Sequence, residues 1–146
     1  MKTAAQILKS KPDQTVYTLG PHASAHEAAR LMADKNIGAL VVVEQGQVVG
    51  MVSERDYVRK LVFMSHPPTE TAVADIMSSP VMYVHPHRTS DECRALMTEN
   101  RMRHLPVMDG NQLVGVVSIG DLVKDTISEQ QFIIEQLEHY ITGQRD

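Results

Sequence analysis

Tryptophan is absent from this sequence of 146 residues, and the other aromatic residues make up only 4% of it. Nine methionines are present, so we expect adaptable core packing rather than aromatic platforms for stacking. An excess of positive charge is also lacking, because the 18 acidic residues outnumber the 14 lysines and arginines and the formal net charge is −4. Without a basic surface to hold a phosphate backbone, the chain is not expected to bind nucleic acid.

Cysteine and long apolar runs are lacking too. The single cysteine, Cys93, cannot form an internal disulfide framework, which favours a reducing compartment. The first residues contain no apolar segment of signal-peptide length, and no run of about 18 apolar residues occurs that could span a membrane. We therefore expect a cytoplasmic protein that does not bind membranes. Hydrophobic residues still make up 42% of the chain, enough for a buried core.

What the sequence does contain is one unit used twice. A shift of 65 residues brings many identical residues into one register, which calls for interpretation as a repeat. The matches pair Pro21-His22 with Pro86-His87, Glu27 with Glu92, Leu31-Met32 with Leu96-Met97, Leu40 with Leu105, Gly50 with Gly115, Ser53 with Ser118, and Asp56 with Asp121.

Each copy predicts the element order β-α-β-β-α, so the fold class is α/β (α+β). An extended segment (15–19 or 81–85) ends near a proline, an amphipathic helix follows, and a short polar turn joins two strands rich in β-branched residues. The predicted domains are residues 1–64 and 73–126, with a linker over 65–72 and a C-terminal amphipathic helix and tail over 127–146. Since a unit of about 60 residues is marginal alone, the two copies should pack around a pseudo-twofold axis.

The most informative motif runs from the last strand of each copy into its last helix. It reads Gly50-Met51-Val52-Ser53-Glu54-Arg55-Asp56 and recurs as Gly115-Val116-Val117-Ser118-Ile119-Gly120-Asp121. Ser-x-x-Asp at a helix start is typical of a capping box, in which both side chains serve only the backbone. The same geometry suits a nucleotide, because the helix N-terminus favours a phosphate and the carboxylate can accept hydrogen bonds from both hydroxyls of a ribose. The two roles are compatible.

The repeat, the element order and this motif resemble the CBS domain, which is named for cystathionine β-synthase and in its paired form is called a Bateman module. Three further segments strengthen the resemblance, which covers about residues 3 to 126. They are Asp75-Ile76-Met77-Ser78, Asn36-Ile37-Gly38-Ala39-Leu40-Val41-Val42 and Arg101-Met102-Arg103-His104-Leu105-Pro106-Val107.

The resemblance implies two clefts between the paired units, each holding an adenosine ligand such as AMP, ATP, ADP or NAD. In each cleft the Ser-x-x-Asp of one unit would grip ribose and phosphate, and segments of the other unit would frame the adenine. One cleft would use Tyr17, Ile37, Gly38, Ala39, Ser118, Gly120 and Asp121. The other would use Ser53, Arg55, Asp56, Ser78, Tyr83, Met102, Arg103 and His104.

The two clefts are not expected to be equal. Arg55, Arg103 and His104 would give the Asp56 cleft a phosphate clamp, whereas the Asp121 cleft has fewer cations, so we expect unequal affinities or different ligands. The alternative for Arg103 is an arm that faces water. Ile7-Leu8-Lys9 departs from the family's opening motif, which leaves no assigned ligand contact at Lys9.

Metal binding and catalysis are not predicted. The spacing of His85, His87 and Cys93 fits no compact zinc motif, and His22 and His26 lack the glutamate of a metalloprotease helix. No Gly-x-Ser-x-Gly elbow occurs, and nothing marks Cys93 as an activated thiol. We therefore expect no catalytic residues, no catalytic cofactor and no enzymatic activity.

Helical periodicity continues beyond the second copy. Ile127, Ile134, Leu137 and Ile141 form an apolar stripe that either packs on the chain's own core or contacts a second chain. The predicted function is a regulatory ligand sensor in signal transduction, working as a homodimer with an unidentified protein partner. Two alternatives stay open: a dimerisation scaffold that works without nucleotide, and an enzyme that acts on a nucleotide.

Overall fold

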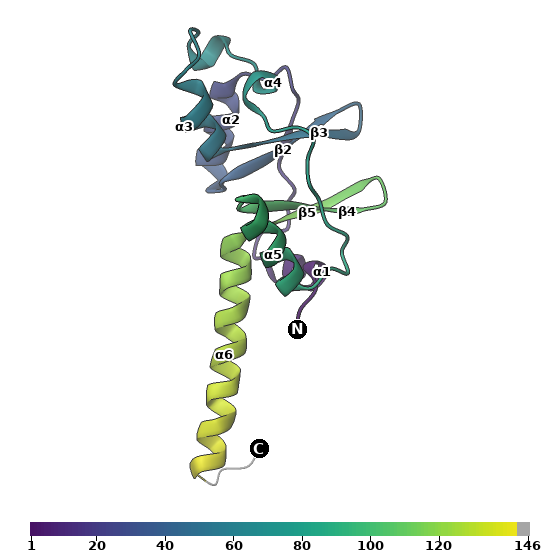
Figure 1. Cartoon of the computed structure of the whole chain (residues 1–146), viewed down its shortest axis with the longest axis vertical. Helices are drawn as coiled ribbons and strands as arrows, with labels where there is room; N and C mark the ends of the chain where they lie inside the picture. The colour runs from purple at the N-terminus through teal and green to yellow at the C-terminus, as the bar shows by residue number, and fades with distance from the viewer. Residues whose placement is uncertain (143–146) are drawn as a thin grey trace. The chain divides into compact units, whose positions relative to one another are not determined.

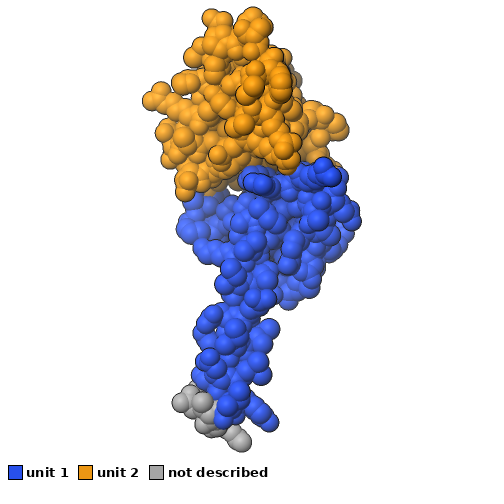
Figure 2. All heavy atoms as spheres, turned by 60° about the vertical axis from the view of Figure 1, so that its left-hand side comes forward, with its two compact units in different colours: residues 1–14, 84–109, 115–146 blue, residues 15–83, 110–114 orange. Residues whose placement is uncertain are grey.

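The computed structural model describes residues 1–142, and residues 143–146 of the predicted C-terminal tail lie outside the described part. The described chain is a mixed α/β fold with two small sheets, as predicted. It groups into two compact units, coloured separately in Figure 2. Unit 1 contains residues 1–14, 84–109 and 115 onward, and unit 2 contains residues 15–83 and 110–114. The repeat-based domain boundaries concern sequence units and stay a prediction.

Unit 2 is built on a three-stranded sheet in the order β1-β2-β3. Strand β1 (Thr18–Leu19) runs parallel to β2 (Ala39–Glu44), and β2 pairs antiparallel with β3 (Gln47–Ser53). The helical elements of this unit are α2 (Ala25–Lys35), α3 (Glu54–Leu61), the 3-10 helix η1 (Pro68–Glu70) and α4 (Val73–Ile76).

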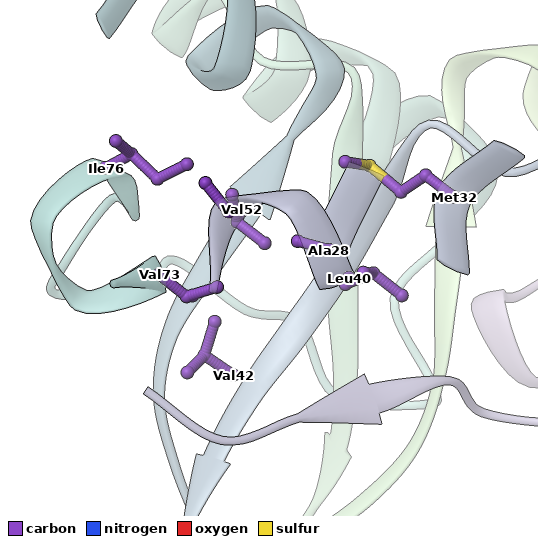
Figure 3. Close-up of a cluster of buried hydrophobic side chains, with 8 residues drawn as sticks. Ala28, Met32, Leu40, Val42, Val52, Val73 and Ile76 are labelled. Atoms are coloured by element: carbon purple, nitrogen blue, oxygen red, sulfur yellow. The ribbon is translucent and has the colours of Figure 1, made fainter. Parts of the chain in front are cut away.

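The core of unit 2 lies where α2, α4 and the sheet meet (Figure 3). Helix α2 contributes Ala25, Ala28 and Met32, whose spacing places them on one helical face. Leu40 and Val42 of β2 are two residues apart and therefore point to the same side of the sheet. Val52, Val73 and Ile76 complete the cluster.

Unit 1 repeats this arrangement with the second copy of the sequence motif. Its elements are α1 (Ala4–Ser10), α5 (Ser90–Asn100), β4 (His104–Asp109), most of β5 (Gln112–Ser118) and α6 (Ile119–Thr142). Strands β4 and β5 pair with each other. The extended segment predicted over 81–85 forms only one bridge, at Val84, which donates to Pro106 and accepts from Met108. Prolines at positions 80 and 86 carry no backbone N–H, which shortens the pairing.

The short helix that opens each copy packs on the other copy. Helix α1 begins the first copy but lies in unit 1, where Ala4 N–H donates to Arg88 and Ser90 N–H donates to Lys2. Helix α4 begins the second copy but lies in unit 2, where Ala25 N–H donates to Thr71. The isolated bridges Thr3–Thr89 and Ser24–Ala72 repeat the same relation. Each compact unit therefore contains segments from both copies.

The predicted C-terminal helix is present. It is the continuation of the last helix of the second copy, so that α6 runs without a break from Ile119 to Thr142. Its first turns contact α1 and α5, and the helix extends beyond them (Figure 1). Within the described residues, no helix is both long and apolar enough to cross a membrane.

Candidate functional site

The Ser53–Asp56 motif sits where β3 passes into α3. Ser53 is the N-cap, and its hydroxyl accepts from the backbone N–H of Asp56 at 3.1 Å. The Asp56 carboxylate accepts in return, through Oδ2, from the Ser53 N–H at 3.0 Å and the Ser53 hydroxyl at 3.1 Å. The predicted capping box is therefore present, and it fixes the carboxylate at the helix N-terminus.

The other carboxylate oxygen of Asp56 has two different partners. Oδ1 accepts from the Ser78 hydroxyl at 3.3 Å and lies 3.4 Å from the Lys60 ammonium, one helical turn further along α3. That ammonium also donates to the Met77 carbonyl at 3.4 Å. The sequence prediction that Ser78 belongs with Asp56 thus has a direct contact within unit 2, while Lys60 was not predicted.

The Ser118–Asp121 motif has the same reciprocal capping at the start of α6. Ser118 N–H donates to Asp121 Oδ2 at 2.9 Å, and Asp121 N–H donates to the Ser118 hydroxyl at 3.1 Å. Here the cation comes from a distant segment. The Lys11 ammonium lies 3.1 Å from Asp121 Oδ2 and also donates to the Val116 carbonyl at 3.1 Å. Each aspartate is therefore paired with one lysine, which comes from the same helix at Asp56 and from a distant segment at Asp121.

The backbone links each motif to the segment that precedes the second strand of its own copy. Glu54 N–H donates to the Gly38 carbonyl at 3.0 Å, and Ile119 N–H donates to the Arg103 carbonyl at 2.8 Å. These bonds satisfy the first N–H of α3 and of α6, which have no partner inside the helix. They bring two of the predicted site residues, Gly38 and Arg103, beside the Ser-x-x-Asp turns.

His104 lies in the same electrostatic environment as Asp121. Burial lowers the pKa of the His104 imidazole, Asp121 opposes that shift, and the positive charges of Lys11 and Arg103 reinforce it. Within unit 1, His104 is therefore a neighbour of Asp121. The prediction that it serves the Asp56 cleft involves both units and stays a prediction.

The motif glycines are required by close approach of the opening segments. A Cβ atom on Gly50 would overlap Met77 Sδ and lie 3.1 Å from the Ser78 carbonyl oxygen. A Cβ atom on Gly115 would lie 2.7 Å and 2.8 Å from the two methyl carbons of Leu8. The absence of a side chain at both positions lets the segments that carry Ser78 and Lys11 reach the two aspartates.

The predicted site residues divide between the two units. Unit 2 holds Tyr17, Ile37, Gly38, Ala39, Ser53, Arg55, Asp56, Ser78 and Tyr83, and unit 1 holds Met102, Arg103, His104, Ser118, Gly120 and Asp121. Each predicted cleft draws on both units, so its composition stays a prediction. Within the units, the contacts above join Ser53, Asp56 and Ser78, and separately Ser118 and Asp121.

Two basic residues were missed. Lys60 stands four residues after Asp56 in a predicted helix, a spacing that indicates a helical ion pair and could have found it. Lys11 lies 105 residues from Val116 in the chain, so no local pattern connects the two. Only the packing of α1 in unit 1 brings this lysine to Asp121.

The polar groups of the two motifs can bind hydroxyl groups and anions. Cys93, in contrast, is not an activated nucleophile. Cys93 is buried, and burial raises the pKa of its thiol, which keeps it protonated and unreactive. Among residues 1–142, no group of three or more histidine, cysteine or acidic residues is placed to hold a metal ion. What each motif does provide is a carboxylate at a helix N-terminus with a lysine beside it.

Comparisons with known proteins agree with the resemblance found in the sequence. The family model for the CBS domain matches residues 5–63 and 73–127. The mitochondrial CBS domain-containing protein CBSX3 of Arabidopsis thaliana is 34% identical over 149 residues, covering 97% of this chain and 72% of the relative.

Solved structures share the fold. A protein with CBS domains from Burkholderia ambifaria has a TM-score of 0.85 and 52% identity, covering 88% of this chain and 96% of that one. The CBS domain pair of protein MJ0100, in complex with 5′-methylthioadenosine and S-adenosyl-L-methionine, has a TM-score of 0.76 and 24% identity, covering 88% of this chain and 98% of that one.

Proposed function

This chain belongs to the CBS domain family, and on that premise we propose that it is a non-catalytic regulatory module whose ligand is an adenine nucleotide. AMP, ATP, ADP and NAD are the candidate ligands, and the cytoplasm is the expected location. The observation that carries the proposal is the duplicated motif, in which Asp56 and Asp121 are both held as carboxylates at the first turn of a helix.

The chemistry of the two motifs supports this ligand class. A carboxylate has two oxygens and about four acceptor sites, so bonds to the backbone leave capacity for the hydroxyls of a ribose. The side chains of Asp56 and Asp121 are 16% and 20% exposed, so both retain some access to solvent. The helix N-terminus beside each aspartate favours the negative charge of a phosphate.

A protein of the same fold, the MJ0100 domain pair, was solved with two adenosine-containing ligands. This shows what the fold can accommodate in that protein and is consistent with an adenosine moiety here. The proposed clefts each use residues of both copies, so a ligand that contacts both would favour the conformation in which it is bound. Occupancy would then act by shifting a conformational equilibrium.

Calorimetry with AMP, ADP, ATP and NAD tests the proposal. The wild type should bind at least one of the four, Asp56→Ala and Asp121→Ala should each remove one site, and the double variant should remove both. Asp34→Ala is the matched control, because Asp34 is exposed on α2 and makes none of the contacts described at the two motifs. Binding of none of the four nucleotides by the folded wild type would refute the proposal.

A second candidate function rests on α6. Its stripe residues Ile127, Leu137 and Ile141 are 58%, 56% and 81% exposed, which favours a protein contact such as a homodimer over packing within the chain. In that case a chain that ends at Thr126 should lose its dimeric mass in light scattering, while nucleotides leave the mass of the full chain unchanged. Product analysis after incubation with ATP or NAD tests the enzyme alternative.

A further inference from the structure

Asp121 is paired with a lysine from a distant segment and acts electrostatically on a histidine from another. Lys11 comes from the end of α1, whereas Arg103 and His104 stand at the start of β4. Lys11 forms the ion pair with Asp121, and the charges of Asp121, Lys11 and Arg103 all act on the His104 imidazole. Lys11 is therefore the permanent positive charge in direct contact with the Asp121 carboxylate.

The Lys11 ammonium is held in place more firmly than a surface lysine. It has two acceptors at 3.1 Å, the Val116 carbonyl and Asp121 Oδ2, and these belong to β5 and α6. The Lys11 side chain is only 30% exposed. An ammonium has three N–H donors, so two fixed acceptors leave one donor for a third partner.

The lysine at the other motif is arranged differently. Lys60 is on the same helix as Asp56, is 41% exposed and makes longer contacts of 3.4 Å to Asp56 Oδ1 and to the Met77 carbonyl. The contacts of Asp56 engage both carboxylate oxygens, whereas the capping bond and the lysine at Asp121 converge on Oδ2. The two motifs share a sequence pattern but differ in how their cation is supplied.

We propose that Lys11 is the specificity-determining residue of the Asp121 site and that it makes this site select a phosphorylated adenosine over the unphosphorylated nucleoside. The proposal rests on the proposed function, since it assumes that a ribose binds to Asp121. The Lys11 ammonium, 3.1 Å from the carboxylate that would bind the ribose, would attract the 5′-phosphate of that ribose, since screening at physiological salt acts over about 8 Å. The nucleoside carries no such charge and gains nothing from Lys11.

The experiment compares AMP with adenosine in the full chain, on an Asp56→Asn background that leaves the Asp121 site to be measured. Calorimetry is performed for this background and for Lys11→Met, Lys11→Gln and Lys11→Arg added to it. Lys60→Met on the same background is the matched control, because it removes the equivalent charge from the other motif. Thermal denaturation of each variant establishes that it is folded.

We expect the background protein to bind AMP more tightly than adenosine. Lys11→Met and Lys11→Gln should weaken AMP binding by about tenfold, as expected for the loss of one charge-assisted contact, and change adenosine binding by less than about twofold. Both substitutions should also reduce the salt dependence of AMP binding. Lys11→Arg should retain most of the preference, and Lys60→Met should retain all of it.

Two results would overturn the role of Lys11 alone. One is an equal loss of AMP and adenosine affinity in Lys11→Met, which would mean that the lysine only positions Asp121. The other is an unchanged AMP affinity. If the folded background protein binds neither compound while the wild type binds AMP, the Asp121 site itself is refuted, and if the wild type binds no adenine nucleotide, the proposed function fails.

Discussion

Gly115 is a position at which an added methyl group would meet a single neighbouring side chain, so its effect can be assigned to one contact. A Cβ atom at Gly115 would stand 2.7 Å and 2.8 Å from the methyl carbons of Leu8, against about 3.5–4.0 Å for carbon atoms at optimal separation. Nothing but Leu8 is among the three nearest atoms, so the conflict lies between β5 and α1. Overpacking of this kind costs about 1–3 kcal/mol, and we expect Gly115→Ala to lower the free energy of unfolding by that amount.

A double-mutant cycle measured by urea denaturation tests this explanation. Leu8→Ala removes the clashing atoms, so the double variant should be more stable than the sum of the single effects by about 1–2 kcal/mol. Gly20→Ala is the control, because its Cβ would meet only the Val43 carbonyl oxygen at 3.9 Å. Additive effects of the two substitutions, or a Gly115→Ala protein as stable as the wild type, would refute the reasoning.

Three further effects are expected, each measurable by chemical denaturation. Lys2→Met removes the ion-pair partner of the buried Asp125, 3.2 Å away, and should lower the free energy of unfolding by about 1–2 kcal/mol. This is less than the roughly 3–5 kcal/mol expected for a fully buried pair, because the Lys2 side chain is 42% exposed. Lys9→Met at an exposed position is the control, and equal losses in the two variants would contradict the role of the ion pair. Burial holds the pKa of His104 below its usual 6.5, so the unfolded chain takes up a proton at a higher pH than the folded chain does. The free energy of unfolding should therefore decrease as the pH is lowered below about 6.5. His104→Gln should reduce this decrease, and an identical decrease in the variant would exclude His104 as its cause. Ser53→Ala removes the N-cap of α3 and should lower the free energy of unfolding by about 1 kcal/mol, whereas Ser53→Thr should lower it much less. An alanine variant as stable as the wild type would show that the cap is dispensable.

The secondary structure could be predicted because its causes are local. Helix α2 begins after Ser24 because that hydroxyl caps the N–H of Glu27, three residues along the chain. The strands around the Gln45-Gly46 turn follow from β-branched runs and from a turn with positive φ at both positions. The capping boxes at Ser53 and Ser118 were equally visible, since donor and acceptor lie three residues apart.

The C-terminal helix could also be predicted from local pattern, because helical periodicity continues beyond the second copy of the repeat. The end of the sequence repeat near Asp125 carries no helix-breaking residue, and the segment from Ile119 to Thr142 contains no proline and only one glycine, Gly120, in the first turn. Backbone hydrogen bonding continues wherever nothing interrupts it. The end of the sequence repeat is therefore not the end of the helix.

By itself, the sequence determined the repeat, the two Ser-x-x-Asp motifs and the family, because these depend on spacing along one chain. That each opening helix packs on the other copy, and hence that Lys11 reaches Asp121, is known only from the tertiary structure. The periodicity of a helix or strand specifies which face is apolar, but many surfaces could cover that face. The choice is made by the fit of whole segments, such as Leu8 against Gly115, and this fit exists only once the chain has folded.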